Sequence, residues 1–312
     1  MLTHLFHILF CFSLSAHGQP VVSTKLALNW KPEPQFGGFY AAQVAGHFKQ
    51  NGLNVEIIPG GAGTPTVQMI AAGKMDFGIV SADEVVMSQS RGGDVVAVFA
   101  AYQTNPQGIM VHAERGIASI KDLYSTEGTL AIQKGLPYAM YLEKKYPKPV
   151  VQIVPYLGGI ANYMSDKKYS QQCFVTSEPL AAEKLGAQTK TFLVAEAGYN
   201  PYTTVLVTRG EVLKKNPKLV KAMVDSVRAG WREYLDKPEA TNKRMGELNK
   251  SMDAATYAES AKAQVKLIET DETKKTGLGT MTEERWSNLA KQLAELKLIS
   301  KVPETKGLFK NL

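Results

Sequence analysis

The sequence predicts an α/β protein with two Rossmann-like lobes and a ligand cleft between them. Two observations support this fold class. Strand-like and helix-like segments alternate from Lys25 onward, a pattern typical of parallel sheets with helices on both faces. The chain has 312 residues, a length that favours two compact units over a single core.

The sequence also indicates how the lobes are connected. No low-complexity linker separates the two units, so we expect the chain to cross between the lobes more than once. The expected crossings lie near residues 107–112 and 202–208. This division assigns residues 19–107 and 208–312 to lobe I, and residues 108–207 to lobe II.

The first 18 residues are predicted to be a signal peptide. The apolar run LFHILFCFSLSA precedes Ala16-His17-Gly18, which has small residues at the two positions that a signal peptidase reads. The run is shorter than the roughly 20 apolar residues that a membrane-spanning helix needs. No Lys or Arg precedes it, which departs from the usual signal pattern and leaves a frayed hydrophobic N-terminus as the alternative. We expect an exported protein.

Four strand-like segments define the first lobe: KLALNW, NVEIIPG, MDFGIVS and DVVAVFAAYQ. Between the first two, a helix is expected over residues 36–52. Apolar side chains recur there at every fourth position, at Phe36, Tyr40, Val44 and Phe48.

Two later helices of this lobe carry start signals. Thr64 is the expected N-cap of a helix over residues 64–73, with Pro65 in the first helical position. Ser81 and Glu84 have the spacing of a capping box. The second unit alternates less clearly, and the chain becomes helical and charged from Glu211 onward.

Composition excludes several classes of function. The net charge is +7, but the Lys residues are dispersed and alternate with Glu, as on solvated helical faces and unlike a nucleic-acid groove. The two cysteines, Cys11 and Cys173, leave one thiol after signal cleavage, which is expected to be a small buried residue. No zinc-ligand spacing, Ser-His-Asp signature or dinucleotide motif is present, so we expect neither a metal nor a cofactor.

Candidate ligand-binding residues follow from the expected sheet. Ligands of open α/β sheets bind outside the carboxyl ends of the strands. After the first strand, Trp30 offers a flat ring for stacking, with a core position as the alternative. Glu33, between two prolines, is either a hydrogen-bond acceptor for an amino-substituted ring or a solvated loop acid. The full candidate set of this segment is Asn29, Trp30, Glu33, Phe36 and Tyr40, although Phe36 and Tyr40 share a helix face and at least one should be core.

The next three strand ends of the first lobe supply further candidates. The loop of Gly61, Ala62, Gly63 and Thr64 is expected to form a cradle of backbone donors, or else a turn that serves only topology. Ser81 and Asp83 are either ligand contacts or caps of their own helix. Tyr102 ends the fourth strand.

In the middle of the chain, Tyr138 follows a Gly-Leu-Pro turn and Tyr202 lies beside an expected crossing. Both tyrosines are expected to line the cleft, where each offers a ring face and a hydroxyl. Glu178 is either a helix cap before Pro179 or a ligand acceptor.

Taken together, these residues resemble a known family. LNWKPEPQFGGFYAAQVAGHFKQNGLNVEI followed by PGGAGTPTVQMIAAGKMDFGIVSADEVV is similar to the solute-binding proteins of ABC transporters, in the group that contains thiamine-pyrimidine-binding proteins and pyrimidine synthases. The likeness runs from about Lys25 to Leu235 and is strongest in the first lobe. No single motif in these segments is specific to the family, but their ordered combination is.

The resemblance implies the periplasmic-binding-protein type II fold. It implies a monomer in the periplasm that captures a small planar heteroaromatic ligand, a thiamine pyrimidine precursor or a vitamin precursor such as riboflavin. The partners would be an ABC permease and its ATPase. The resemblance also makes the Trp30–Tyr40 stretch, the GGAGT loop and the SADE strand end ligand-facing.

The same family contains an enzyme branch, the fungal pyrimidine synthases, which sacrifice an active-site histidine and carry a cysteine-rich motif. Here DFGIVSADEVVMSQSRGG contains no histidine, and the chain has no cysteine cluster. We therefore expect a binding protein and not an enzyme. The alternatives are a pyrimidine-synthase-like enzyme, a binding protein for an alkanesulfonate or another small anion, and a binding module that feeds a sensor.

Overall fold

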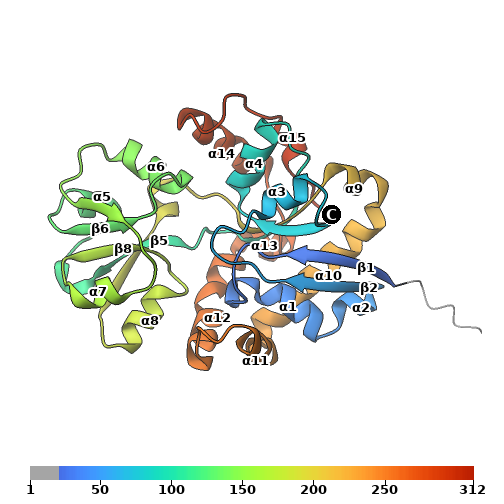
Figure 1. Cartoon of the computed structure of the whole chain (residues 1–312), viewed down its shortest axis with the longest axis horizontal. Coiled ribbons are helices and arrows are strands. Elements are labelled where there is room, and N and C mark those ends of the chain that lie inside the picture. Colours follow the sequence, from blue (N-terminus) through green and yellow to red (C-terminus); the bar gives the residue numbers. More distant parts are fainter. Residues whose placement is uncertain (1–20) are drawn as a thin grey trace, which may run out of the picture.

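The structure is a computed structural model that describes residues 21–312, so the predicted signal peptide lies outside the described residues. Two five-stranded sheets with flanking helices form two lobes that lie side by side (Figure 1). This confirms the predicted two-lobed α/β class. Within residues 21–312, no helix is both long and apolar enough to cross a membrane.

The sheet of lobe I has the strand order β2-β1-β3-β10-β4. β1 pairs in parallel with β2 and β3, whereas β10 runs antiparallel to both β3 and β4. The sheet is therefore mixed and not purely parallel as expected, because β10 enters from lobe II and runs opposite to β3 and β4. In spatial order the strands are Leu53–Ile58, Val22–Ala27, Phe77–Val80, Thr203–Thr208 and Val96–Tyr102.

The sheet of lobe II has the order β7-β6-β8-β5-β9. β6 is parallel to β7 and β8, and β5 is antiparallel to β8 and β9. The two lobes therefore share one plan, in which the fourth strand of the sheet runs antiparallel to the other four. The strands in spatial order are Gln152–Pro155, Thr129–Ile132, Tyr169–Phe174, Gln107–His112 and Thr189–Leu193.

The chain crosses between the sheets twice, from β4 to β5 and from β9 to β10. Residues 103–106 make the first crossing, just before the position expected from the sequence. The second crossing precedes Thr203, so β10 belongs to the lobe I sheet although the sequence assigns residues up to 207 to lobe II. The crossings are tied together, because the Asn105 backbone N–H donates to Oδ1 of Asn200 at 2.8 Å.

Helices cover both sheets. Those of lobe II are α5 (Ile120–Tyr124), α6 (Pro137–Lys145), α7 (Ala161–Ser165) and α8 (Glu178–Lys184). Those of lobe I from the first half of the chain are α1 (Gly37–Val44), α2 (His47–Gln50), α3 (Thr66–Ala71) and α4 (Ala82–Ser90). The C-terminal helices are α9 (Gly210–Lys215), α10 (Pro217–Asp236), α11 (Glu239–Leu248), α12 (Ala254–Ile268), α13 (Asp271–Thr276), α14 (Glu283–Glu295) and α15 (Thr305–Leu308).

Close helix packing explains the paired glycines of FGGFYAA. A Cβ on Gly37 would overlap the ring of Tyr234, and a Cβ on Gly38 would overlap the ring of Trp231, both on α10. From α10, Gly230 approaches the carbonyl of Gly38 in the same way. These glycines therefore let α1 and α10 come together in the core.

The helix expected over residues 36–52 is broken in two. Gly46 has a φ of 78°, a left-handed conformation that suits glycine, and it separates α1 from α2. Val44 is 44% exposed, so it does not share the buried face of Tyr40 and Phe48.

One of the two predicted helix starts is confirmed. Ser81 and Glu84 form the capping box of α4. The start of α3 differs, because Pro65 is its N-cap and Thr64 lies outside the helix. The Thr64 hydroxyl instead accepts a hydrogen bond from the Gly61 N–H at 2.8 Å.

Candidate ligand-binding site

The end of β1 leads into a short loop that presents Trp30 and Glu33. The Trp30 side chain is 37% exposed, and its Nε1–H donates to Oε1 of Glu33 at 3.3 Å. Asn29, just before it, is half-buried. Pro32 and Pro34 flank Glu33 and restrict the backbone on both sides. The loop therefore holds an indole and a carboxylate next to each other.

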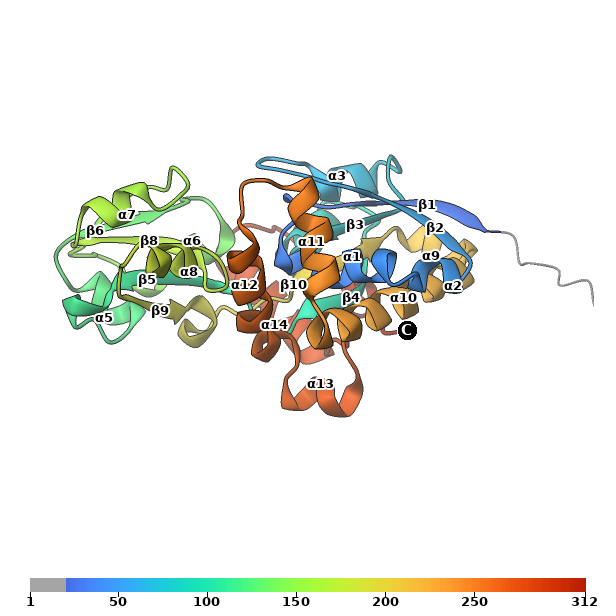
Figure 2. The same cartoon turned by 90° about the horizontal axis from the view of Figure 1, so that it is seen from below.

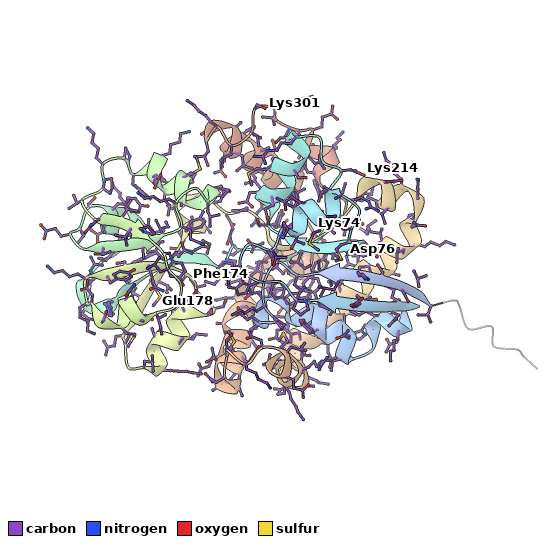
Figure 3. The ribbon with its side chains drawn as sticks, in the orientation of Figure 1. Lys74, Asp76, Phe174, Glu178, Lys214 and Lys301 are labelled. Carbon is purple, nitrogen blue, oxygen red and sulfur yellow. The ribbon has the colours of Figure 1, made fainter. Side chains whose placement is uncertain are left out.

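Lobe II offers a similar pair. Glu178 begins α8 and lies, with Phe174, on the side of lobe II that is turned toward lobe I (Figure 3). Its Oε2 accepts from the Phe174 N–H at 2.9 Å, and its Oε1 accepts from the Tyr156 hydroxyl at 3.3 Å. Each lobe thus places a carboxylate beside an aromatic side chain that donates to it.

The charge of Glu178 acts across the lobes on Glu33. Burial raises the pKa of Glu33 to about 7, opposed by the hydrogen bond from Trp30, and the negative charge of Glu178 raises it further. Burial also raises the pKa of Glu178. Ionising both groups without a partner is unfavourable, so a ligand with amino donors or a positive charge between them would be stabilised.

A polar network lies at the strand ends of lobe II. Oε1 of Gln172 accepts from the Tyr138 hydroxyl and from the Gln133 N–H, both at 2.6 Å. Nε2 of Gln172 donates to Oε1 of Gln133 at 2.9 Å. Tyr138 is buried, so its hydroxyl is used inside the lobe. Sequence reasoning singles out Tyr138 but misses the glutamines, because a glutamine inside a strand gives no distinctive pattern.

The loop of Gly61, Ala62, Gly63 and Thr64 is a turn after β2 in which Ala62 and Gly63 are exposed. Two of the donors expected to face a ligand are used within the protein. The Gly60 N–H donates to the Trp30 carbonyl at 3.0 Å, and the Gly61 N–H donates to Thr64. A Cβ on Gly60 would overlap the Leu28 carbonyl. The loop therefore supports the Trp30 strand end, and a ligand-facing role for the N–H groups of Ala62 and Gly63 stays a prediction.

Ser81 and Asp83 also bond mainly within the protein. The Ser81 hydroxyl contacts the Asp83 carboxylate and Oε2 of Glu84. Oδ2 of Asp83 accepts from the hydroxyl of Tyr199 at 3.1 Å. Burial raises the pKa of Asp83. Tyr199 belongs to the second crossing, so Asp83 joins α4 to that crossing, a contact that the sequence did not suggest.

Four aromatic candidates belong to the core. Phe36, Tyr40, Tyr102 and Tyr202 are all at most 2% exposed. The Tyr102 hydroxyl donates to Gln264, and the Tyr202 hydroxyl accepts from a backbone N–H. Both Phe36 and Tyr40 are core, where at least one was expected to be. For Tyr102 and Tyr202 burial corrects the prediction of a ligand-facing ring, because a ring at a strand end or a crossing can turn inward as well as toward the cleft.

The histidines of residues 21–312 lie away from the two carboxylates. In the register of β5 with β8, Gln107 pairs with Phe174, and His112 lies five residues further along, about 17 Å from that end. The Nε2 of His112 contacts the Tyr163 carbonyl at 2.8 Å. His47 begins α2, before β2, and so lies at the opposite end of β2 from Gly60. Neither ring is placed to act between Glu33 and Glu178. Cys173 is buried as predicted, and burial raises the pKa of its thiol.

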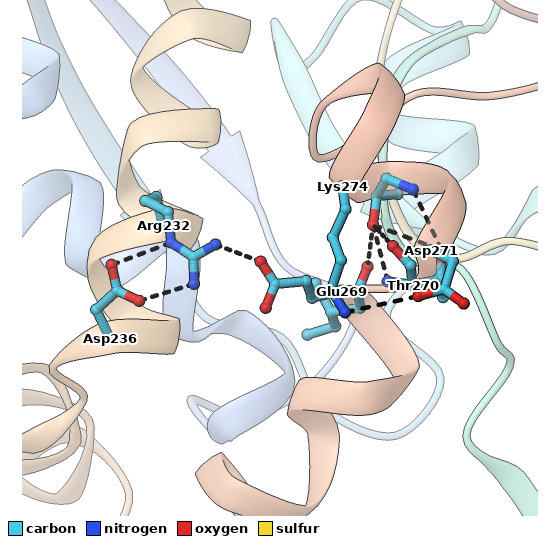
Figure 4. Close-up of polar contacts among 8 residues, drawn as sticks. Arg232, Asp236, Glu269, Thr270, Asp271 and Lys274 are labelled. Carbon is cyan, nitrogen blue, oxygen red and sulfur yellow. Dashed lines mark hydrogen bonds and ion pairs between the residues drawn. The ribbon is translucent and has the colours of Figure 1, made fainter.

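A separate hollow of about 520 Å³ lies between α10 and α13. Its cations are already paired: Arg232 contacts Asp236 at 2.7 Å and Glu269 at 2.5 Å, and Lys274 contacts Asp271 at 3.6 Å (Figure 4). Because these charges are neutralised internally, we assign no ligand to this hollow.

Comparison with known proteins agrees with this architecture. The model of the family described as NMT1/THI5 like matches residues 33–241. The 4-amino-5-hydroxymethyl-2-methylpyrimidine phosphate synthase THI11 of Saccharomyces cerevisiae is 27% identical over 245 residues, which cover 69% of this chain and 71% of the yeast protein. The riboflavin-binding protein RibY of Chloroflexus aurantiacus is 22% identical over 237 residues, covering 72% of this chain and 66% of RibY.

Solved structures show the fold. The periplasmic aliphatic sulphonate binding protein SsuA of Escherichia coli superimposes with a TM-score of 0.71 at 12% identity, covering 94% of each chain. The periplasmic nitrate-binding protein NrtA of Synechocystis PCC 6803 gives a TM-score of 0.65 at 13% identity, covering 93% of this chain and 86% of NrtA. This chain therefore has the periplasmic-binding-protein type II fold, and it belongs to the NMT1/THI5-like family.

Proposed function

We propose that this protein is the exported solute-binding component of an ABC importer. It captures a small planar heteroaromatic ligand, a thiamine pyrimidine precursor or a vitamin precursor such as riboflavin, and delivers it to a permease and its ATPase. The observation that carries this proposal is the pair of carboxylates, Glu33 in lobe I and Glu178 in lobe II, each beside an aromatic donor and close enough for the charge of Glu178 to act on Glu33.

The binding mode follows from the groups at hand. The exposed face of the Trp30 indole stacks on the ring, and the two carboxylates accept hydrogen bonds from its amino groups or protonated nitrogen. Closure of the lobes then excludes water and strengthens both interactions. The relatives THI11, named for synthesis of a pyrimidine phosphate, and RibY, named for binding riboflavin, support a nitrogen heterocycle as the ligand class.

An anionic ligand is less well supported. SsuA and NrtA are named for a sulphonate and for nitrate, but their identity to this chain is too low to transfer a ligand. Two half-buried carboxylates, when ionised, repel an anion placed between them. We therefore favour a neutral or cationic ring.

Catalysis is the second candidate function, because the yeast relatives are synthases. The positions of His47 and His112, away from the carboxylates, do not supply the reactive histidine that such an enzyme sacrifices. Incubation with pyridoxal phosphate and iron, followed by peptide mass spectrometry, tests this candidate: a modified side chain would support the enzyme, and unmodified protein would support the binding role.

Calorimetry on the mature protein tests the ligand class. The probes are 4-amino-5-hydroxymethyl-2-methylpyrimidine, thiamine and riboflavin, compared with ethanesulfonate and nitrate. We expect at least one heteroaromatic probe to bind with a Kd of about 1 μM or below and to lose about tenfold or more in affinity in Glu33→Gln and in Glu178→Gln. Glu304→Gln, on an exposed loop, is the matched control. Binding of the anions alone would overturn the heteroaromatic assignment.

A further inference from the structure

Helix α12 lies between α11 and lobe II (Figure 2) and follows the residues that the family model matches. One face of α12 is buried, with Tyr257, Ser260, Gln264 and Leu267 at the spacing of neighbouring turns. Polar side chains on this face are directed at both lobes, which is unusual for a helix that only covers a core.

Toward lobe I, side chains of α12 donate hydrogen bonds to the loop that contains Glu33. The Tyr257 hydroxyl donates to the Pro32 carbonyl at 2.7 Å, and Nε2 of Gln264 donates to the Pro34 carbonyl at 3.1 Å. Asn249, in the turn before α12, donates from Nδ2 to the same Pro32 carbonyl at 3.2 Å. These hydrogen bonds fix the backbone on both sides of the carboxylate.

Toward lobe II, α12 contacts both ends of α8, the helix whose first residue is Glu178. The Ser260 hydroxyl donates to the Thr176 carbonyl, just before α8. At the other end of α8, Lys184 donates to the Thr256 hydroxyl at 2.6 Å and pairs with Asp253, the N-cap of α12, at 3.0 Å.

We propose that α12 is a positioning element of the binding site, which sets the separation between Glu33 and Glu178 through hydrogen bonds to the two segments that carry them. Tyr257 and Ser260 are three residues apart on one rigid helix, about 4.5 Å along its axis. The identity of the molecule that binds between the carboxylates rests on the proposed function, whereas the positioning does not. It follows that part of the specificity of this chain lies outside residues 33–241.

The test needs no ligand. Trp30 is exposed, whereas Trp231 and Trp286 are fully buried, so the emission that acrylamide quenches reports Trp30. Because the Trp30 N–H donates to Glu33, ionisation of Glu33 changes this emission, and a pH titration gives its midpoint. Glu178→Gln should lower the midpoint by removing the nearby negative charge. We expect Tyr257→Phe to lower the midpoint as well. When Glu178→Gln is added to Tyr257→Phe, it should shift the midpoint by about half as much as it does in the wild type, or less.

Tyr141→Phe is the matched control, because its hydroxyl also donates to a backbone carbonyl, that of Ala197 at 2.9 Å, but away from α12. Ser260→Ala tests the lobe II side independently and serves if Tyr257→Phe does not fold. An effect of Glu178→Gln that is equal in the wild type, Tyr257→Phe and Ser260→Ala would overturn the positioning role. If Tyr257→Phe reduces the effect of Glu178→Gln on the titration midpoint but no heteroaromatic probe binds, the positioning role stands and only the proposed function fails.

Discussion

The two lobes present similar aromatic–carboxylate pairs, but the cores that support these pairs differ. In lobe I, the loop of Trp30 and Glu33 leads into α1, whose glycines bring its backbone against α10 in an apolar core. In lobe II, Glu178 follows β8, a strand that buries the polar residues Ser170, Gln171 and Gln172. Close apolar packing therefore lies beneath the first pair and satisfied hydrogen bonds lie beneath the second, so the two supports should respond differently to substitution.

The packing of lobe I gives the largest expected effect. Gly38→Ala places a methyl group inside the ring of Trp231, which neither helix can accommodate without moving. We expect the free energy of unfolding to fall by about 3 kcal/mol or more, measured by urea denaturation. Gly61→Ala is the control, because its Cβ would meet nothing within 4 Å and should change stability by less than about 0.5 kcal/mol. Similar losses in both variants would contradict the packing explanation.

The hydrogen-bonded foundation of lobe II gives the next effect. Gln172→Leu removes the acceptor of both the Tyr138 hydroxyl and the Gln133 N–H. We expect a loss of about 2 kcal/mol in the free energy of unfolding, because buried donors are left unsatisfied. Gln171→Leu removes one hydrogen bond, to the Gly159 carbonyl, and should cost about half as much. If Gln172→Leu leaves the free energy of unfolding unchanged in thermal and chemical denaturation, the hydrogen bonds to Gln172 do not stabilise lobe II.

The carboxylate of lobe I predicts a pH dependence. The folded pKa of Glu33, about 7, lies above its ordinary value of 4.5, so the folded protein favours the protonated form. Stability therefore falls as pH rises from about 4.5 through about 7. We expect Glu33→Gln to be about 1–2 kcal/mol more stable than the wild type at pH 8, allowing for solvent screening, and equally stable at pH 4. Denaturation at both pH values, with Glu304→Gln as reference, checks this, and an equal difference at both would refute it.

The ion pair of Lys184 with Asp253, which joins the two lobes, should have the smallest effect. Lys184 pairs with Asp253 at 3.0 Å, but the Asp253 side chain is largely exposed. We expect Lys184→Gln to lower the free energy of unfolding by less than about 1 kcal/mol, and the difference to disappear in about 1 M salt, where charges are screened. Lys144→Gln is the comparison, since its pair with Glu295 also joins the lobes but is more exposed. A loss that persists at high salt would show that Lys184 acts through packing or through its hydrogen bond to Thr256.

The sequence suggested contacts of the candidate site most readily where one continuous segment makes them. Glu33 stands between Pro32 and Pro34, and Trp30 comes two residues before Pro32, so the local sequence was enough to propose both as candidates. Tyr156 was missed because its partner, Glu178, lies 22 residues away and the contact exists only once β7 and β8 share a sheet. Asn249, Tyr257 and Gln264 were missed for the same reason, since they meet Pro32 and Pro34 only in three dimensions.

The fold was predicted at the level of class and most strands, and the errors have physical causes. Both sheets are mixed, because the chain enters and leaves lobe II through antiparallel strands that strand propensity cannot orient. Phe36 and Tyr40 were candidates for the cleft, but the glycines beside them signal helix contact as readily as ligand approach. Only the position of α10 separates these two interpretations.

The place of β10 has a consequence for biosynthesis. β10 lies between β3 and β4 in the lobe I sheet, yet it follows all of lobe II in the sequence. Until Thr208 has left the ribosome, β3 and β4 each lack this neighbour and expose an unpaired edge. Lobe II can therefore finish folding before lobe I, and a nascent chain that pauses within lobe II presents open strand edges to chaperones or to a second chain.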